Sequence, residues 1–260
     1  MESRQTAGSS YGDVMRKRNS DTQPGWGSLP IVPTLLAIGL VLAPAGAVFA
    51  GEKESDRLNE SRDVLVEMSG MKEGAPREIL EKAKCVIVIP GVKKAAIGLG
   101  GRFGYGAAVC RTSNGEGRWS PPLMVSLKGG SVGFQIGGQS SDFVLLVMNQ
   151  KGVDNLLKSK FTLGADASIA AGPLGRNAEA GTDLRMRAEI LSYSRSRGVF
   201  AGISLEGASL RQDEGANRAI YGGAVHPRTL LLESGQAIPA EAKGFVEAIE
   251  RLTSGRNPEP

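Results

Sequence analysis

The segment from Cys85 to Arg111 alternates in side-chain size with a period of two. Glycine, alanine, Arg102 and Cys110 occupy its even positions from 98 to 110, and bulky or apolar side chains occupy the odd positions Ile97, Leu99, Phe103, Tyr105, Ala107 and Val109. A period of two is typical of a β-strand, because successive side chains point to opposite faces of the sheet. We therefore expect one bulky face and one nearly bare face, with another part of the protein packed closely against the bare one.

The order of the predicted elements indicates the fold class. Helical patterns at 52–68 and 76–84 precede a series of strand-like segments, and further helical patterns at 213–221 and 239–252 follow it. The chain contains 36 glycines without a collagen-like period, and they cluster within the strand-like segments, which indicates close backbone approach within a sheet. The sequence predicts an α+β fold with a Gly-rich, mainly antiparallel curled sheet or partial barrel and N- and C-terminal helices.

Turn and cap signals divide the region between these helices. Pro90-Gly91 predicts a turn after a strand at 85–89, Asn114-Gly115 a hairpin that returns at Trp119, and Gly129-Gly130 a turn. Asn149 is expected to cap a short helix. Strands are predicted at 123–127, 131–137, 143–148, 161–171, 190–195 and 199–206, and the one at 143–148 is apolar enough to be covered on both faces.

The first fifty residues are typical of an export signal. A basic cluster at 16–18 precedes an apolar run from 29 to 49, and small residues precede Gly51. Signal peptidase accepts small residues at these positions, so we expect cleavage after Ala50, with Ala47 as the second choice. An uncleaved anchor is the alternative. The protein is thus expected to be exported to the periplasm or cell envelope, or secreted, with an N-terminal extension and signal peptide at 1–50, one domain at 51–252 and a flexible tail at 253–260.

Two cysteines, Cys85 and Cys110, follow the predicted signal. An oxidising compartment permits a disulfide between them, since each lies at the edge of a strand-like segment. Two buried free thiols remain the alternative.

Positive charge is concentrated in the middle of the chain. The segment from 82 to 128 holds eight basic residues and a single acid, Glu116, in a chain whose net charge is +4. This excess favours an anionic partner; the alternative is a set of solvated surface charges, paired in part with the C-terminal acids Glu241, Glu247 and Glu250. The candidate residues are Lys82, Lys84, Lys93, Lys94, Arg102, Arg111, Arg118 and Lys128.

Other kinds of site find little support in the sequence. The glycines at 98–106 lie within a strand, whereas a dinucleotide fingerprint needs them between a strand and a helix. His226 is the only histidine, and no nucleophile elbow accompanies it, so no catalytic residue is assigned and an enzyme is not expected. Two sulfurs and one distant histidine make a poor metal site, and no cofactor is expected. Nucleic acid is not an expected partner, because stacking aromatics are sparse.

Several motifs together resemble one family. These are AKCVIVIPGVKKAAIGLGGRFGYGAAVCR, WSPPLMVSLKGGSVGFQIGGQSSDFVLLVMN, FTLGADASIAAGPLG and YSRSRGVFAGISLEGASL followed by AIYG. The chain resembles the SYLF family, also called the Ysc84 actin-binding domain family, over about residues 55–252. The resemblance implies binding of anionic phospholipids and phosphoinositides through basic residues and an amphipathic N-terminal helix, and actin binding in some eukaryotic relatives.

Charge and resemblance together lead to one main expectation. We expect a non-enzymatic domain that binds anionic phospholipid or a membrane surface in the bacterial cell envelope through its basic residues, helped by the 52–68 helix. Because this helix also carries acids, the alternative is that its apolar face packs on the sheet. The alternative is an envelope scaffold whose sheet docks a protein partner or a second copy of the chain. Actin is not expected as a partner of an exported bacterial protein.

Overall fold

The computed structural model describes residues 46–71, 74–97, 99–115, 117–132, 137–174, 187–196, 199–202 and 205–254. Most of the predicted export signal, at 1–45, therefore lies outside the described residues, as does most of the loop at 175–186. The cleavage site and the choice between signal peptide and anchor remain predictions. No helix in the described ranges is both long enough and apolar enough to cross a bilayer.

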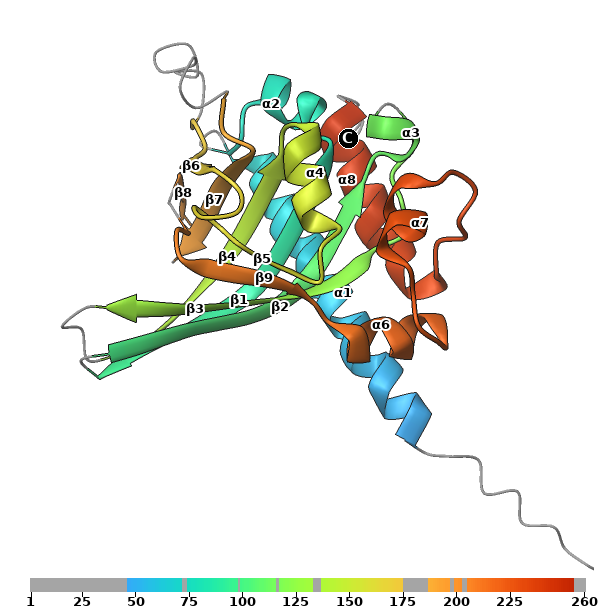
Figure 1. The fold of residues 1–260 in the computed structure, drawn as a ribbon, viewed down its shortest axis with the longest axis horizontal. Coiled ribbons are helices and arrows are strands. Elements are labelled where there is room, and N and C mark those ends of the chain that lie inside the picture. The colour runs from blue at the N-terminus through green and yellow to red at the C-terminus, as the bar shows by residue number, and fades with distance from the viewer. Residues whose placement is uncertain are drawn as a thin grey trace, which may run out of the picture. The chain divides into compact units, whose positions relative to one another are not determined.

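Helices at both ends of the described chain enclose a series of strands (Figure 1). In chain order the elements are α1 (Gly46–Gly70), α2 (Arg77–Lys82), β1 (Cys85–Ile97), β2 (Leu99–Cys110), α3 (Thr112–Gly115), β3 (Leu123–Val132), β4 (Gly137–Val147), α4 (Gln150–Leu156), β5 (Lys160–Thr162), β6 (Ile169–Ala171), β7 (Ile190–Ser196), β8 (Val199–Gly202), β9 (Ala208–Gln212), α6 (Glu214–Tyr221), α7 (Pro227–Leu232), η2 (Ala240–Ala242) and α8 (Lys243–Ser254).

The nine strands of the described residues form one sheet in the order β5-β9-β3-β2-β1-β4-β7-β6, and β8 also pairs with β7. All pairs are antiparallel except β6 with β7. The two end strands β5 and β6 are joined by only the short segment 163–168, so the sheet has to curl until its ends approach each other. The predicted α+β class with a curled, mainly antiparallel sheet and terminal helices is confirmed.

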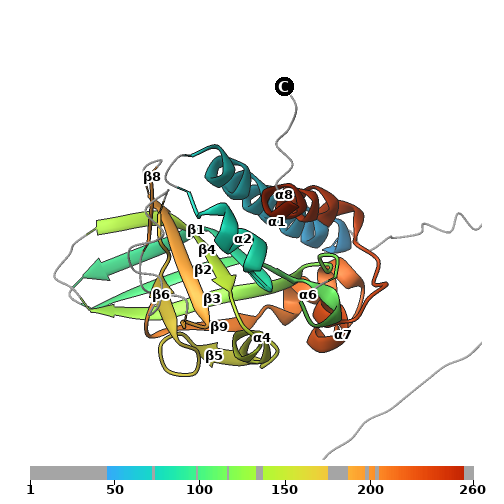
Figure 2. The ribbon, with the colours of Figure 1, turned by 90° about the horizontal axis from the view of Figure 1, so that it is seen from above.

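Each face of the sheet carries its own hydrophobic core. On the helix-covered face, α1 and α8 lie side by side and α2 packs near them (Figure 2). On the concave face, apolar residues from β5 and β6 at the two ends of the sheet join one cluster with residues of α4 and α7. Burial on both faces explains the uninterrupted apolar run of β4, in which residues 143–147 are all buried.

Pro90 and Gly91 do not end a strand, contrary to the sequence prediction. They form a β-bulge inside the continuous strand β1, where the pairing with β2 shifts between Val88 and Lys93. Gly91 has a φ of 55°, in the left-handed region that favours glycine, and its backbone N–H donates to Asp142 Oδ1 at 2.8 Å. The bulge therefore replaces a ladder hydrogen bond with one to a side chain.

The bare face of β2 is covered by β1 itself. A Cβ added at Gly104 would lie 2.6 Å from Val92 Cγ2 and 2.9 Å from Ile89 Cγ2. A Cβ added at Gly106 would collide with the carbonyl oxygen of Val88 and lie 2.8 Å from Ile89 Cα. The glycines thus make room for the bulge, as the alternation in the sequence required.

The other predicted caps and turns are formed only in part. Asn149 accepts a hydrogen bond from Gly152 N at 3.0 Å and caps α4, as expected. Gly129-Gly130 lies inside β3 and makes no turn, 161–171 forms two short strands instead of one, and Asn114-Gly115 belongs to the short helix α3. The chain still returns at Trp119, which bridges to Arg111. The sequence patterns did not reveal β9 and α7.

The C-terminal helix continues past the expected domain boundary at 252. Thr253 is buried and accepts a hydrogen bond from Trp119 Nε1 at 3.1 Å. This contact ties the last turn of α8 to the loop after α3.

We expect Gly106→Ala to be strongly destabilising, because its Cβ would overlap the backbone of β1 and a backbone cannot move aside as a side chain can. The free energy of unfolding from urea titration should fall by roughly 3 kcal/mol. Gly130→Ala is the matched control in a neighbouring strand, since nothing lies within 4 Å of the added Cβ; it should change stability by less than about 0.5 kcal/mol. Equal effects of the two substitutions would contradict this packing.

Candidate functional site

The eight candidate basic residues do not form one patch. Lys82, Lys84, Arg111 and Arg118 lie near the end of β1 and β2 where Cys85 pairs with Cys110, and we call them the disulfide-end group. Lys93, Lys94, Arg102 and Lys128 lie toward the opposite end of the same strands, and we call them the strand-tip group. About nine residues of β1 separate the groups, or roughly 30 Å of extended chain.

The disulfide-end group lies among acidic residues. Arg111 stacks on the ring of Trp119 with 4.5 Å from its guanidinium carbon to the ring centroid. Burial lowers the pKa of Arg111 from its usual value, while the charge of Glu81 acts in the opposite direction. Arg111 and Arg118 share a cleft of about 770 Å³ with Glu247 and Glu250 of α8. Arg111 and Arg118 thus lie close to two of the C-terminal acids that the sequence suggested as partners of the basic residues.

The strand-tip group is divided between the two faces of the sheet. Lys93 of β1 and Lys128 of β3 both pair with Phe103 of β2, so the three residues form a row across three strands on the helix-covered side. Lys94 pairs with Arg102 and lies with it on the concave side. The four charges of the strand-tip group therefore belong to two different surfaces.

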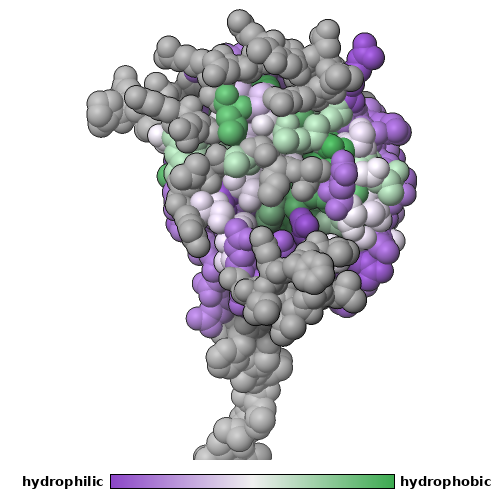
Figure 3. Space-filling model, turned by 90° about the vertical axis from the view of Figure 1, so that its left-hand side faces the viewer, coloured by the Kyte–Doolittle hydropathy of each residue, from purple (hydrophilic) through white to green (hydrophobic). Residues whose placement is uncertain are grey.

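Aromatic rings are exposed in the row that contains the two lysines. Phe103 is 48% exposed and Tyr105, two residues along β2, is 40% exposed. The sheet extends here beyond its helical cover, and apolar and strongly hydrophilic surface lie next to each other at this end of the molecule (Figure 3). The sequence pattern identified both rings as part of a bulky strand face but not as exposed. The lysines on either side of Phe103 become its neighbours only through the register of β1 and β3, so no local signal in the sequence could have found this row.

A groove of about 670 Å³ separates these rings from the first turns of α1. Lys93, Phe103 and Tyr105 line it on the strand side. Helix α1 contributes residues of both signs: the acids Glu52, Asp56 and Glu60 and the bases Lys53 and Arg57. All the negative charge of this groove is therefore on the helix, and the positive charge is shared between the helix and Lys93.

Helix α1 is held firmly to the sheet. Leu58, Val64, Leu65 and Met68, the apolar positions expected from the sequence, are all buried. Arg57 is buried as well: it pairs with Asp213 Oδ2 at 3.1 Å, and its guanidinium carbon lies 4.8 Å from the centroid of the Tyr105 ring. Of the two alternatives for the apolar face of this helix, contact with lipid or packing on the sheet, the structure shows packing on the sheet and on α8.

Histidine and the metal-binding side chains are the remaining residue types of interest in the described part of the chain. His226 is exposed and precedes α7 as its N-cap residue. The described ranges contain no group of three or more His, Cys, Asp or Glu side chains placed to hold a metal ion.

Comparison with known proteins identifies the family. Residues 128–252, from the end of β3 through most of α8, match the Ysc84 family model, described as Las17-binding protein actin regulator. The chain carries a Ysc84-family domain. The match begins at Lys128, so Lys93, Lys94 and Arg102 precede it.

Relatives of the Ysc84 domain come from fungi and animals. An SH3 domain-containing protein of Schizosaccharomyces pombe is 42% identical over 177 residues, which cover 66% of this chain and 40% of the relative. The human SH3 domain-containing YSC84-like protein 1 is 34% identical over 179 residues, or 68% of this chain and 51% of the relative. LAS seventeen-binding protein 3 of Saccharomyces cerevisiae is 34% identical over 190 residues, or 72% and 40%. The chain thus spans about half or less of the length of these relatives.

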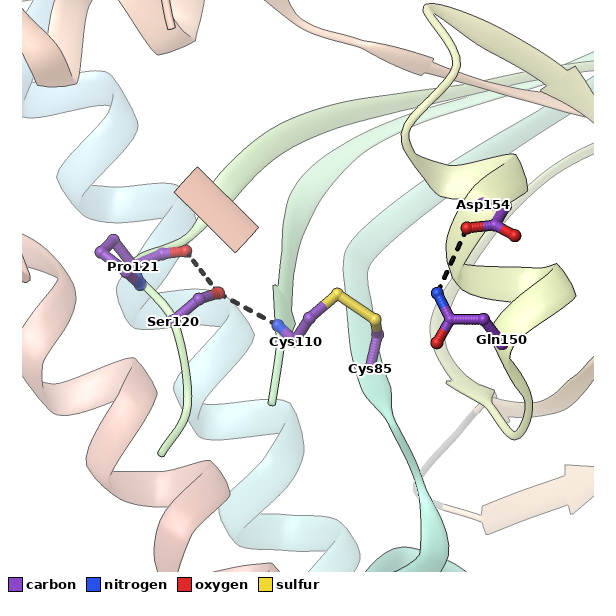
Figure 4. The surroundings of a disulfide bond; sticks show 6 residues. All are labelled: Cys85, Cys110, Ser120, Pro121, Gln150 and Asp154. Atoms are coloured by element: carbon purple, nitrogen blue, oxygen red, sulfur yellow. Dashed lines mark hydrogen bonds between the residues drawn. A yellow bond between two sulfur atoms is a disulfide. The ribbon is translucent and has the colours of Figure 1, made fainter. Parts of the chain in front are cut away.

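In this chain the two cysteines form a disulfide between the paired residues Cys85 and Cys110, buried in the concave core (Figure 4). Beside it, the hydroxyl of Ser120 accepts a hydrogen bond from Cys110 N at 3.1 Å and donates one to Pro121 O at 2.9 Å. The disulfide therefore ties β1 to β2 at the end opposite the strand-tip group.

We expect the double substitution Cys85→Ala/Cys110→Ala to lower the free energy of unfolding by roughly 3 kcal/mol, because the crosslink restricts the unfolded chain between two cysteines with a sequence separation of 25. Urea unfolding of the oxidised protein, with and without a reductant, measures this effect. The reductant should reproduce the loss in the natural sequence and leave the double variant unchanged. Indifference of the natural sequence to the reductant would show that the thiols are free.

Proposed function

We propose that this Ysc84 domain binds anionic phospholipid surfaces, without catalysis, through the row Lys93, Phe103 and Lys128. The observation that carries the proposal is the pairing register, which places an exposed phenylalanine between two lysines at the tip of the sheet. An aromatic ring inserted at the level of the headgroups, flanked by cations that meet lipid phosphates, is the arrangement of many proteins that lie on a membrane surface.

The expected energetics are those of a modest, salt-sensitive interaction. Each lysine near an anionic surface contributes about 1 kcal/mol, and this contribution weakens as salt shortens the Debye length. Tyr105 adds a second partly exposed ring beside Phe103. The part of α1 that lines the far side of the groove carries three acids and two bases, and this net negative charge favours an orientation in which the strand tips, and not α1, contact the lipid.

We place this activity in the bacterial cell envelope, after export. Two features support this location: the basic and apolar composition of residues 16–49 is that of an export signal, and a disulfide such as Cys85–Cys110 persists in oxidising compartments.

Binding of a protein partner is the second candidate function. The family description names a Las17-binding protein and actin regulator, and one relative is named LAS seventeen-binding protein 3. In this chain the groove between α1 and the strand tips, which carries charges of both signs, is the surface that would take such a partner.

Co-sedimentation of the full chain with vesicles tests the lipid proposal. We expect binding to vesicles that contain phosphatidylglycerol, little binding to phosphatidylcholine vesicles, and weakening as salt rises. Lys93→Glu/Lys128→Glu should reduce the affinity for anionic vesicles at least about tenfold, because it replaces two attractive charges with repulsive ones. Phe103→Ser should reduce it as well, through the loss of apolar insertion.

The matched control reverses two exposed charges of the disulfide-end group, Lys82→Glu/Arg118→Glu, which alters the net charge equally. This variant should bind as the natural sequence does. Equal losses in both double variants would indicate a net-charge effect without a defined surface. Absence of binding to either kind of vesicle would overturn the lipid proposal and favour the protein partner.

A further inference from the structure

A separate pocket opens on the concave face at the strand tips. Its volume is about 290 Å³. Residues of five strands line it: β1, β2, β4, β7 and β8. The pocket therefore lies at the mouth of the curled sheet, a common position for small-molecule sites in barrel-like folds. The lipid-binding row lies on the other face, so the two surfaces are distinct.

The charges in this pocket are unbalanced. Lys94 and Arg102 are direct partners across β1 and β2, and like charges placed opposite each other destabilise a sheet. None of the described residues that line the pocket is acidic. The undescribed segments 133–136, 197–198 and 203–204, which border these strands in the sequence, contain no acidic residue either.

A nearby acid, Asp142, is engaged elsewhere. It lies between Ser141 and Phe143 in β4, and alternation along the strand directs its side chain to the helix-covered face. There it accepts hydrogen bonds from Gly91 N at 2.8 Å and from Arg195 Nε at 2.7 Å. Asp142 therefore does not neutralise Lys94 or Arg102.

Hydrogen-bond donors converge on the same space. Arg102 is half-buried, and its Nε is buried without a hydrogen-bond partner in the described part of the chain. A buried donor of this kind costs free energy unless a ligand satisfies it. Gln139 of β4 pairs with Lys94 of β1, and its side-chain amide donates a hydrogen bond to Ser196 Oγ at 3.1 Å. Ser141 and Ser194 add two more hydroxyls to the pocket.

The shape and polarity of the pocket define the ligand class. Two cations match a doubly charged anion, and a guanidinium, an ammonium and several hydroxyls match the multiple oxygens of a tetrahedral group. The apolar side chains of Val92, Phe143 and Ala201 form the other walls and lower the local dielectric, which strengthens the ionic contacts.

We propose that this pocket binds a phosphate monoester, through Lys94 and Arg102, with the serine hydroxyls as additional donors. The phosphate group can belong to a soluble metabolite or to a lipid headgroup, and its recognition is the same in both cases. The proposal does not depend on membrane binding by the row Lys93, Phe103 and Lys128.

Calorimetric titration of the full chain with inorganic phosphate tests the site. We expect saturable binding that strengthens as the pH rises from roughly 5.5 to 7.5, because phosphate gains its second negative charge with a pKa of about 6 to 7. Binding of sulfate should not change with pH over this range. Arg102→Gln and Lys94→Gln should each weaken phosphate binding at least tenfold, whereas Lys93→Gln/Lys128→Gln on the opposite face should leave it unchanged.

Thermal unfolding gives an independent readout that does not rely on one variant. Phosphate should raise the melting temperature of the natural sequence, and Lys94→Gln should raise it without phosphate, because it removes the like-charge pair. Absence of saturable phosphate binding, or equal binding by Arg102→Gln, Lys94→Gln and the natural sequence, would overturn the proposal.

Vesicles distinguish the two sources of the phosphate group. Phosphatidic acid carries a phosphate monoester and phosphatidylglycerol a diester. If Arg102→Gln loses both phosphate binding and a preference for phosphatidic acid, the site takes a lipid headgroup. If it loses phosphate binding alone, the site takes a soluble ligand. Either result supports the pocket, and neither requires that the lysine and phenylalanine row bind membranes.

Discussion

The close approach of β1 to the glycines of β2 is the constraint on which both candidate surfaces depend. Gly104 and Gly106 carry no side chains, so the bulge at Pro90 and Gly91 can lie directly over them. The bulge adds one residue to β1 and inverts the faces of all later residues in that strand. Without it, Lys93 would pair with Arg102 and face the concave side. With it, Lys93 joins Phe103, and Lys94 joins Arg102.

Disulfide and bulge act at opposite ends of the same strand pair. Near Cys85, both faces of the sheet are covered by helices and the basic residues lie beside the acids of α8. Toward Lys94, β1 and β2 extend beyond this cover, and exposed rings and unneutralised cations remain. The sheet is thus covered by helices near the disulfide, and its opposite end offers one candidate surface on each face. This arrangement is consistent with a binding domain of the Ysc84 family.

Much of the fold could be predicted, because local patterns report burial. The apolar positions of α1, the Asn149 cap and the buried strand β4 all follow from periodicity and capping chemistry. Turns were less predictable. Pro90-Gly91 and Gly129-Gly130 have the composition of turns, yet long-range pairing keeps both within strands. Residues 161–171 form two strands, β5 and β6, because the curled sheet brings both of its ends to this segment. No local pattern encodes that curling.

By itself, the sequence determined that one face of β2 must be bare, that something must pack against it, and that positive charge gathers in the same region. These are properties of composition and spacing, so they can be read without a structure. Only the tertiary structure decided that β1 covers the glycines and that the eight basic residues divide into separate groups. The reason is physical: a one-residue bulge reverses the direction of every following side chain, and its position is set by packing between strands.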